Sequence, residues 1–193
     1  GQKVSSAKDN GAIFAIATNQ RAEMGALDAV KQSMQRGQSI VDVALAAGET
    51  ITKALEEQKS LAVAIASSTG AAQTAYLADY NALGGEITKA LAGATFDGVN
   101  LFSNTTQQSV LTSTSGATQN IGTGAAITVA TTATLTAPAD ATAAQAAITA
   151  VDTAISGFTA ELGKLGTQSK SMERQLTFVS KMQDSLEVGI GNL

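Results

Sequence analysis

Residues 27–55, LDAVKQSMQRGQSIVDVALAAGETITKAL, decide the fold. Apolar side chains recur along this stretch at intervals built from threes and fours, at Leu27, Val30, Met34, Val41, Ala44, Ile51 and Leu55. Such spacing is typical of a helix face that packs in a heptad seam. The pattern begins upstream at Ile13 and Ile16, and no proline interrupts it. We therefore expect one continuous helix over about residues 12–66.

The seam has gaps that indicate what covers it. Gln20, Glu23, Gly37 and Gly48 interrupt the apolar series. Because a dimeric coiled coil favours a regular seam, we expect the partner to be another helix of the same molecule. At about 1.5 Å per residue the helix extends on the order of 80 Å, longer than a compact globule of this size is wide. The sequence thus predicts an elongated molecule.

Two further helices follow from the same spacing. The break at residues 67–70 precedes a helical stretch over about 71–94, which Gly84 and Gly85 weaken. Pro138 and Asp140 precede a last helix over about 142–188. We expect this helix to lie antiparallel to the first. The predicted fold class is mainly α: an elongated antiparallel bundle of long helices with a small β-hairpin region.

The middle of the chain is different in composition. An Asp97-Gly98 pair between apolar residues predicts a tight turn, and no charged residue lies between Asp97 and Asp140. This segment is either a disordered polar insert or a set of short strands, such as residues 126–131, joined by turns at Gly116 and at residues 122–124. We favour strands. The predicted organisation is residues 1–102 as the first half of the bundle, 103–140 as the uncharged segment and 141–193 as the last helix.

Composition argues against catalysis. The chain of 193 residues has no cysteine, histidine or tryptophan, so it lacks thiolate nucleophiles and the commonest general base. The acidic pairs Glu56-Glu57 and Asp9 with Asp28 are interpreted as solvated surface, since adjacent helical residues point about 100° apart. Residues 97–100 lack the ligand pattern of a calcium loop, and residues 122–124 are too short for a dinucleotide motif. We expect no enzyme activity, no metal and no cofactor.

Charge and hydropathy restrict the partners. The formal net charge is -4, which provides no basic field for nucleic acid or anionic lipid. No stretch approaches the roughly 18 consecutive apolar residues of a membrane span. We expect neither nucleic-acid binding nor membrane insertion.

Several segments together resemble bacterial flagellin. The motifs are GQKVSSAKDNGA at residues 1–12, AIA at 15–17, RAEM at 21–24, QSIVDVA at 38–44, KSLAVA at 59–64, FDGVNLF at 96–102, ITAVDTAI at 148–155 and LGTQSKSM at 165–172. The resemblance covers nearly the whole chain. Residues 11–14 and the pair Ser169-Lys170 depart from the common family pattern, which points to a divergent, short alphaproteobacterial-type flagellin.

The resemblance implies a function. It implies a structural subunit of the flagellar filament that self-assembles for swimming motility, is secreted through the flagellum's own channel and becomes extracellular. Its implied partners are other flagellin subunits and the flagellar export and capping proteins. We interpret the chain as the rod domain without the family's terminal helices, and expect it not to polymerise alone. The alternatives are a hook–filament junction protein, or a cell-surface flagellin homologue that binds polysaccharide through residues 103–136.

The resemblance also indicates a candidate receptor-facing helix surface. In flagellins detected by the mammalian Toll-like receptor for flagellin it reads Gln-Arg-x-Arg-Glu-Leu-Ala-Val, and the matching residues here include Glu56, Glu57, Lys59 and Leu61. Glu57 replaces an arginine, which reverses a charge and removes a planar bidentate donor. We expect weak or absent activation of that receptor.

Overall fold

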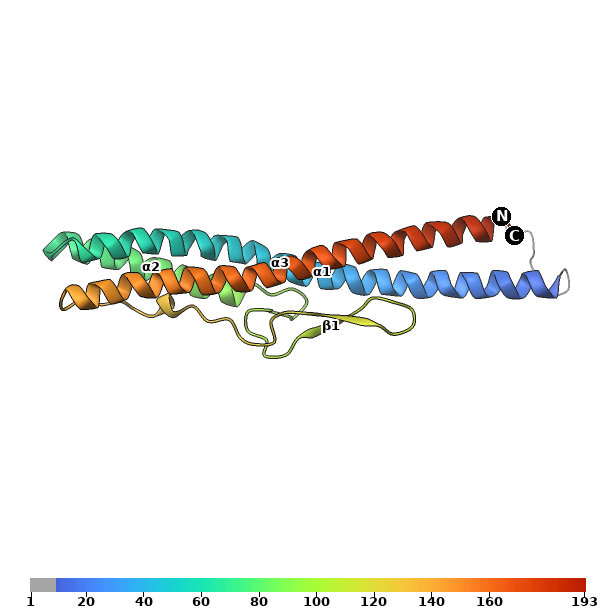
Figure 1. The fold of residues 1–193 in the computed structure, drawn as a ribbon, viewed down its shortest axis with the longest axis horizontal. Coiled ribbons are helices and arrows are strands. Elements are labelled where there is room, and N and C mark those ends of the chain that lie inside the picture. The colour runs from blue at the N-terminus through green and yellow to red at the C-terminus, as the bar shows by residue number, and fades with distance from the viewer. Residues whose placement is uncertain (1–9) are drawn as a thin grey trace. The chain divides into compact units, whose positions relative to one another are not determined.

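The computed structural model describes residues 10–193. In chain order its elements are α1 (Gly11–Ala66), α2 (Gly70–Gly93), β1 (Gln108–Leu111), β2 (Thr118–Ile121), a short 3₁₀ helix (Ala130–Thr132) and α3 (Ala141–Gly191) (Figure 1). The mainly α fold class with a small hairpin is confirmed. The opening motif of residues 1–9, including Asp9, lies outside the described residues.

The described chain divides into two compact units. Unit 1 contains the described residues up to Ser39 together with Gln108–Ile121 and Gln168–Leu193, and unit 2 contains Ile40–Gln107 and Gly122–Thr167. Each unit holds a section of α1 and a section of α3. Unit 1 adds the hairpin, and unit 2 adds α2 and the irregular segment that precedes α3. The division at residues 102 and 140 stays a prediction.

Local signals start and stop the helices where the sequence predicts. Asn10 accepts hydrogen bonds from the backbone N–H groups of Ala12 and Ile13 at 3.1 Å each, and Asp140 accepts one from Ala143 at 2.8 Å. Both side chains are N-caps, which satisfy donors that have no partner inside a helix. Gly70, with φ of 64°, begins α2 after the break that ends α1.

Sections of α1 and α3 lie antiparallel within each unit. In unit 2, Gly48 lies against Leu162 and Lys59 forms an ion pair with Asp152 at 2.8 Å. The residue number thus rises along one helix while it falls along the other. The predicted antiparallel packing is confirmed in this unit.

Unit 1 shows the same order. The Gln38 side-chain amide donates to Ser169 Oγ at 2.6 Å, and Gly189 lies beside Gln20.

The heptad seam is buried along almost all of its predicted length. Seam residues with at most 3% exposure are Leu27, Val30, Met34, Val41, Ala44, Ile51, Leu55, Ala62 and Ile65 on α1, and Val151, Phe158, Leu165, Met172 and Val179 on α3. Ile16 is an exception, because it is 48% exposed. Its predicted place in the seam is wrong, because Ala17, one residue further along α1, is 3% exposed and takes the buried position instead.

Two glycines that interrupt the apolar pattern are points of close approach. A Cβ on Gly48 would lie 2.4 Å from the Leu162 side chain, and one on Gly37 would lie 2.6 Å from Val110. Such distances are shorter than any van der Waals contact between carbon atoms. Both glycines therefore admit a large neighbouring side chain into the seam.

In unit 1 the β1–β2 hairpin lies on the helices. Val110 pairs with Gln119 across the antiparallel ladder, and its side chain fills the space at Gly37. Gln119 contacts α3 through the Gln168 carbonyl, Ser171 and Gln175. These hydrogen bonds to α3 take the place of the hydrogen bonds to water that the Gln119 side chain would otherwise make.

The predicted strand at residues 126–131 is wrong. The segment is extended but has no neighbouring strand: Ile127 N–H donates to the Phe102 carbonyl at 2.7 Å, and the 3₁₀ helix follows. The side-chain amide of Asn81 on α2 makes two hydrogen bonds to the backbone of Leu135: it donates one to the carbonyl and accepts one from the N–H. We call residues 123–135 the strap. Its polar groups bond to α1, to α2 and to loops, so the β-branched residues here form no ladder.

A small apolar cluster in unit 2 joins α1, α2 and α3. Its buried members are Ala62, Ile65, Tyr80 and Val151. Burial raises the pKa of the Tyr80 phenol above its ordinary value of 10.0.

The close approach at Gly48 makes a first prediction. Gly48→Ala should lower the free energy of unfolding by about 1 kcal/mol, because overpacking against Leu162 outweighs the helix propensity that alanine adds. Gly163→Ala is the matched control, since a Cβ there meets nothing within 4 Å. It should stabilise by about 0.5–1 kcal/mol. Denaturant unfolding of the three proteins measures both, and equal stabilisation by the two substitutions would contradict the packing.

Tyr80 makes a second prediction. Because its folded pKa is raised, the folded state holds the phenol proton more tightly, so this group's stabilisation is full below pH 10 and is lost as pH rises through the folded pKa. As pH rises above about 10, Tyr80→Phe should lose less stability than the unsubstituted protein. Denaturant unfolding at a series of alkaline pH values measures this. If the free energy of unfolding falls equally with pH in Tyr80→Phe and in the unsubstituted protein, the raised pKa of Tyr80 is refuted.

Candidate functional site

A groove runs between α1 and α2 in unit 2. Its larger part, about 460 Å³, is lined by Glu57, Ser60, Leu61, Asp79, Ala82, Leu83 and Glu86. A smaller part of about 220 Å³ shares Glu57, Leu83 and Glu86 and continues past Lys53. The two parts form one feature, which we call the α1/α2 groove. The groove has an apolar floor. Its charged lining consists of the carboxylates of Glu57, Asp79 and Glu86 and the ammonium of Lys53, so the groove is acidic.

The structure separates the four predicted receptor-facing residues. Glu57 and Leu61 line the α1/α2 groove. Lys59 points instead to α3, where it pairs with Asp152, and both side chains remain about half exposed. Glu56 is exposed and lines neither part of the groove. The predicted surface therefore presents one carboxylate and one apolar side chain together, with the ammonium on another side of the helix.

Gln58, between these residues, is a fully buried polar side chain in the seam. Its amide group donates to the carbonyls of Tyr80 on α2 and Thr131 in the strap, at 3.2 and 3.3 Å. A Cβ on Gly84 would lie 3.1 Å from the same Thr131 carbonyl, so the strap lies directly on α2. Gln58 thus fixes α2 and the strap against α1. A glutamine at a seam position between Leu55 and Ala62 is the sequence signal that could have identified it.

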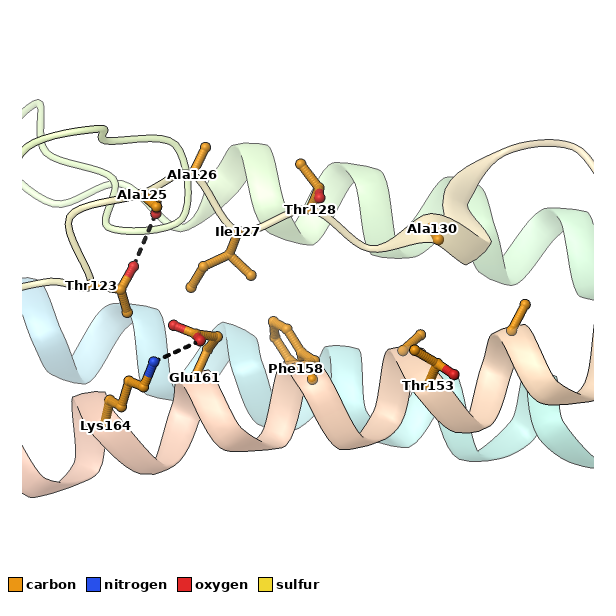
Figure 2. Close-up of a pocket in the computed structure, with 13 residues that line it drawn as sticks. Thr123, Ala125, Ala126, Ile127, Thr128, Ala130, Thr153, Phe158, Glu161 and Lys164 are labelled. Atoms are coloured by element: carbon orange, nitrogen blue, oxygen red, sulfur yellow. Dashed lines mark hydrogen bonds and ion pairs between the residues drawn. The ribbon is translucent and has the colours of Figure 1, made fainter.

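The strap covers a second groove, of about 630 Å³, against α3. Figure 2 shows Ile127 from the strap pointing toward Phe158 of α3, with Glu161 and Lys164 at one end. Phe158 is 3% exposed, and its ring lies 5.8 Å from that of Phe102. It is the only aromatic residue of the lining, so this groove lacks the exposed aromatic platforms that sugar sites use.

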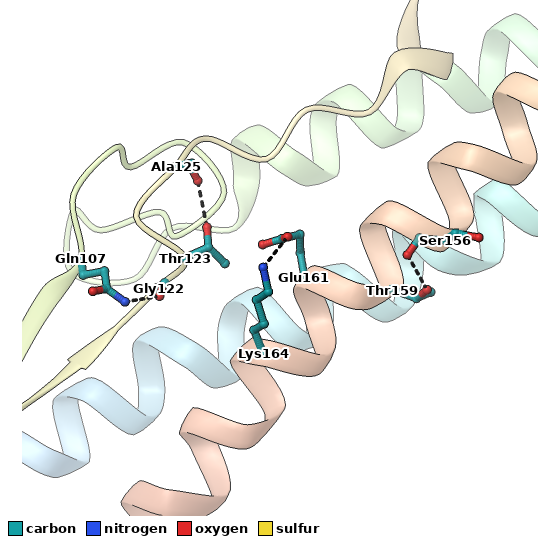
Figure 3. A network of polar contacts seen from close by, with 8 residues as sticks. All are labelled: Gln107, Gly122, Thr123, Ala125, Ser156, Thr159, Glu161 and Lys164. Carbon is teal, nitrogen blue, oxygen red and sulfur yellow. Dashed lines mark hydrogen bonds and ion pairs between the residues drawn. The ribbon is translucent and has the colours of Figure 1, made fainter.

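The polar contacts around this groove are local. In Figure 3, Gln107 donates to the Gly122 carbonyl at 2.8 Å and Thr123 to the Ala125 carbonyl at 2.9 Å. Glu161 and Lys164 pair at 3.0 Å one helical turn apart. These contacts hold the loop and the helix surface in shape, and they converge on no common point.

The remaining candidates are turns. Asp97 and Gly98 have φ of 51° and 76°, and Phe96 and Val99 exchange two 2.9 Å backbone hydrogen bonds around them. The predicted tight turn is confirmed. Within residues 10–193, no three potential metal-ligating side chains are grouped, and no helix is both long and apolar enough to cross a membrane.

Comparison with known proteins identifies the family. The family model described as the bacterial flagellin N-terminal helical region matches residues 1–107. Flagellin FljM of Caulobacter vibrioides is 45% identical over all of this chain and 72% of its own length, and flagellin FljK of the same organism is also 45% identical with the same coverage. The crystal structure of Bacillus cereus flagellin superposes with a TM-score of 0.65 at 25% identity, covering 76% of this chain and 88% of that one.

The similarity extends across the two long helices and the segment between them. It favours neither a hook–filament junction protein nor a polysaccharide-binding homologue. The chain therefore belongs to the bacterial flagellin family, a family of structural proteins rather than enzymes, and it is a structural subunit of the flagellar filament.

Proposed function

We propose that this flagellin leaves the cell through the flagellar export channel, meets the capping proteins at the growing tip and there joins other subunits in an extracellular filament for swimming. It binds no nucleic acid in this role, consistent with its net charge of -4. The observation that carries the proposal is the packing of α1 against α3 within each unit. A seam of small and medium apolar residues gives stiff packing and leaves the outer helix faces for contacts with neighbouring subunits.

Antiparallel helices suit a subunit that transmits mechanical load. Each buried seam residue contacts the facing helix, so bending must disturb many contacts at once. The outward faces carry most of the charged side chains, which keep a free subunit from associating nonspecifically. Each unit thus combines a closely packed helix seam with polar outer faces, which suits a subunit that packs against neighbours.

A sole-flagellin strain tests the proposal. The complete gene should restore filaments and swimming in a flagellated bacterium whose resident flagellin genes are deleted. Ala44→Glu should abolish both, because it places a carboxylate at a seam position with 0% exposure. Ala46→Glu, two residues along the same helix and exposed, should preserve both. Electron microscopy and motility assays measure the outcome; secreted, folded subunits that never form filaments would refute the proposal.

We further propose that this flagellin activates the mammalian Toll-like receptor for flagellin weakly or not at all. Glu57 supports the proposal, because its exposed carboxylate stands where detected flagellins carry an arginine. Reporter cells treated with the complete protein should respond weakly, and Glu57→Arg should raise the response, whereas Glu56→Arg should change it little. Full-strength signalling by the unsubstituted protein would contradict this proposal and leave the filament role intact.

A further inference from the structure

An outer face of α3 in unit 1 is basic and carries an exposed aromatic ring. Lys170, Arg174 and Lys181 are exposed, and between the last two Phe178 is 63% exposed. Positions i, i+4, i+8 and i+11 share one side of a helix. We call these four residues the α3 basic face. The face thus combines an exposed apolar ring with cations on either side of it along the helix.

The α1/α2 groove of unit 2 has the complementary chemistry. Asp79 and Glu86 stand on α2 with Leu83 between them, and Glu57 stands across the groove on α1. Leu83 is half-buried and Asp79 and Glu86 are exposed. The groove therefore offers an apolar seat between two carboxylates that a cation can reach.

The two surfaces also match in spacing. On α2, Leu83 follows Asp79 by four residues and Glu86 follows Leu83 by three; on α3, Phe178 and Lys181 follow Arg174 by the same intervals. In both cases the outer charges lie two turns, about 10 Å, apart. Laid parallel, the helices bring each cation to a carboxylate and the phenyl ring to Leu83. If the helices are laid antiparallel and the charges are paired, Phe178 and Leu83 are out of register by one position.

We propose that the α3 basic face of one subunit docks in parallel on the α1/α2 groove of a second copy of this chain, pairing Arg174 with Asp79, Phe178 with Leu83 and Lys181 with Glu86. The inference rests on the filament function and names the contact surfaces. A second copy is the occupant because every subunit carries both surfaces. Such a contact is heterologous, and repeated heterologous contacts build open helical filaments when the rotation between neighbours does not close into a ring.

Cysteine crosslinking between copies tests the contact. The sequence has no cysteine, so a Leu83→Cys protein and a Phe178→Cys protein, each produced as the complete flagellin, can be mixed and polymerised. A short bis-maleimide should join them into heterodimers, which different affinity tags distinguish from homodimers. Val188→Cys replaces Phe178→Cys in the control, because Val188 is 64% exposed but lies ten residues further along α3.

The outcomes separate this inference from the function. Filaments that give abundant 83–178 heterodimers and few 83–188 heterodimers support it. Normal filaments without 83–178 heterodimers overturn the contact and leave the filament role standing. If the complete, unsubstituted protein forms no filaments at all, that result counts against the filament role itself.

Charge exchange tests the register. Arg174→Glu should raise the critical concentration for assembly about fivefold, the scale expected of one exposed charge pair. Adding Asp79→Arg should restore it, whereas adding Glu86→Arg should not. Rescue by Glu86→Arg and not by Asp79→Arg would replace the parallel register by the antiparallel one, and rescue by neither would overturn the pairing.

Discussion

Close packing of α1 against α3 is the constraint on which the rest of the structure depends. Gly37 and Gly48 leave room for Val110 and Leu162, so a hairpin side chain enters the seam in unit 1 and an α3 side chain enters it in unit 2. Once the seam is formed in unit 2, Gln58 presents its amide to α2 and the strap. The smaller elements therefore lie where the seam offers them a space or a hydrogen bond.

Much of this arrangement could be predicted from the sequence, because apolar spacing and capping residues are local signals. The three helices begin and end within a few residues of their predicted bounds. The exposure of Ile16 could not be predicted from the apolar spacing, because the small side chain of Ala17 is buried at this level of α1 in its place. Gly37 and Gly48 were predicted as gaps in the pattern, and only the packing shows that neighbouring side chains fill them.

The strands were harder to predict. The β-branched residues around Ile127 favoured a ladder there, but a strand needs a neighbour, and this segment lies on α2 instead. The observed strands, QSVL and TQNI, are polar and were not identified individually. Their register depends on contacts of Gln119 and Leu111 with residues far away in sequence. For the candidate site, the resemblance placed Glu57 and Lys59 on one surface. Side chains two positions apart on a helix, however, point about 200° away from each other.

Antiparallel seam packing within the units is the central claim, and paired cysteines measure it most directly. Four proteins, with cysteines at 48 and 162, 59 and 152, 48 and 152, or 59 and 162, can be treated with a short bifunctional maleimide and separated on a denaturing gel. The contacts of Gly48 with Leu162 and Lys59 with Asp152, all within unit 2, predict efficient intramolecular crosslinks in the first two proteins only. Efficient crosslinking of the 48–152 and 59–162 pairs, with none in the others, would contradict the account.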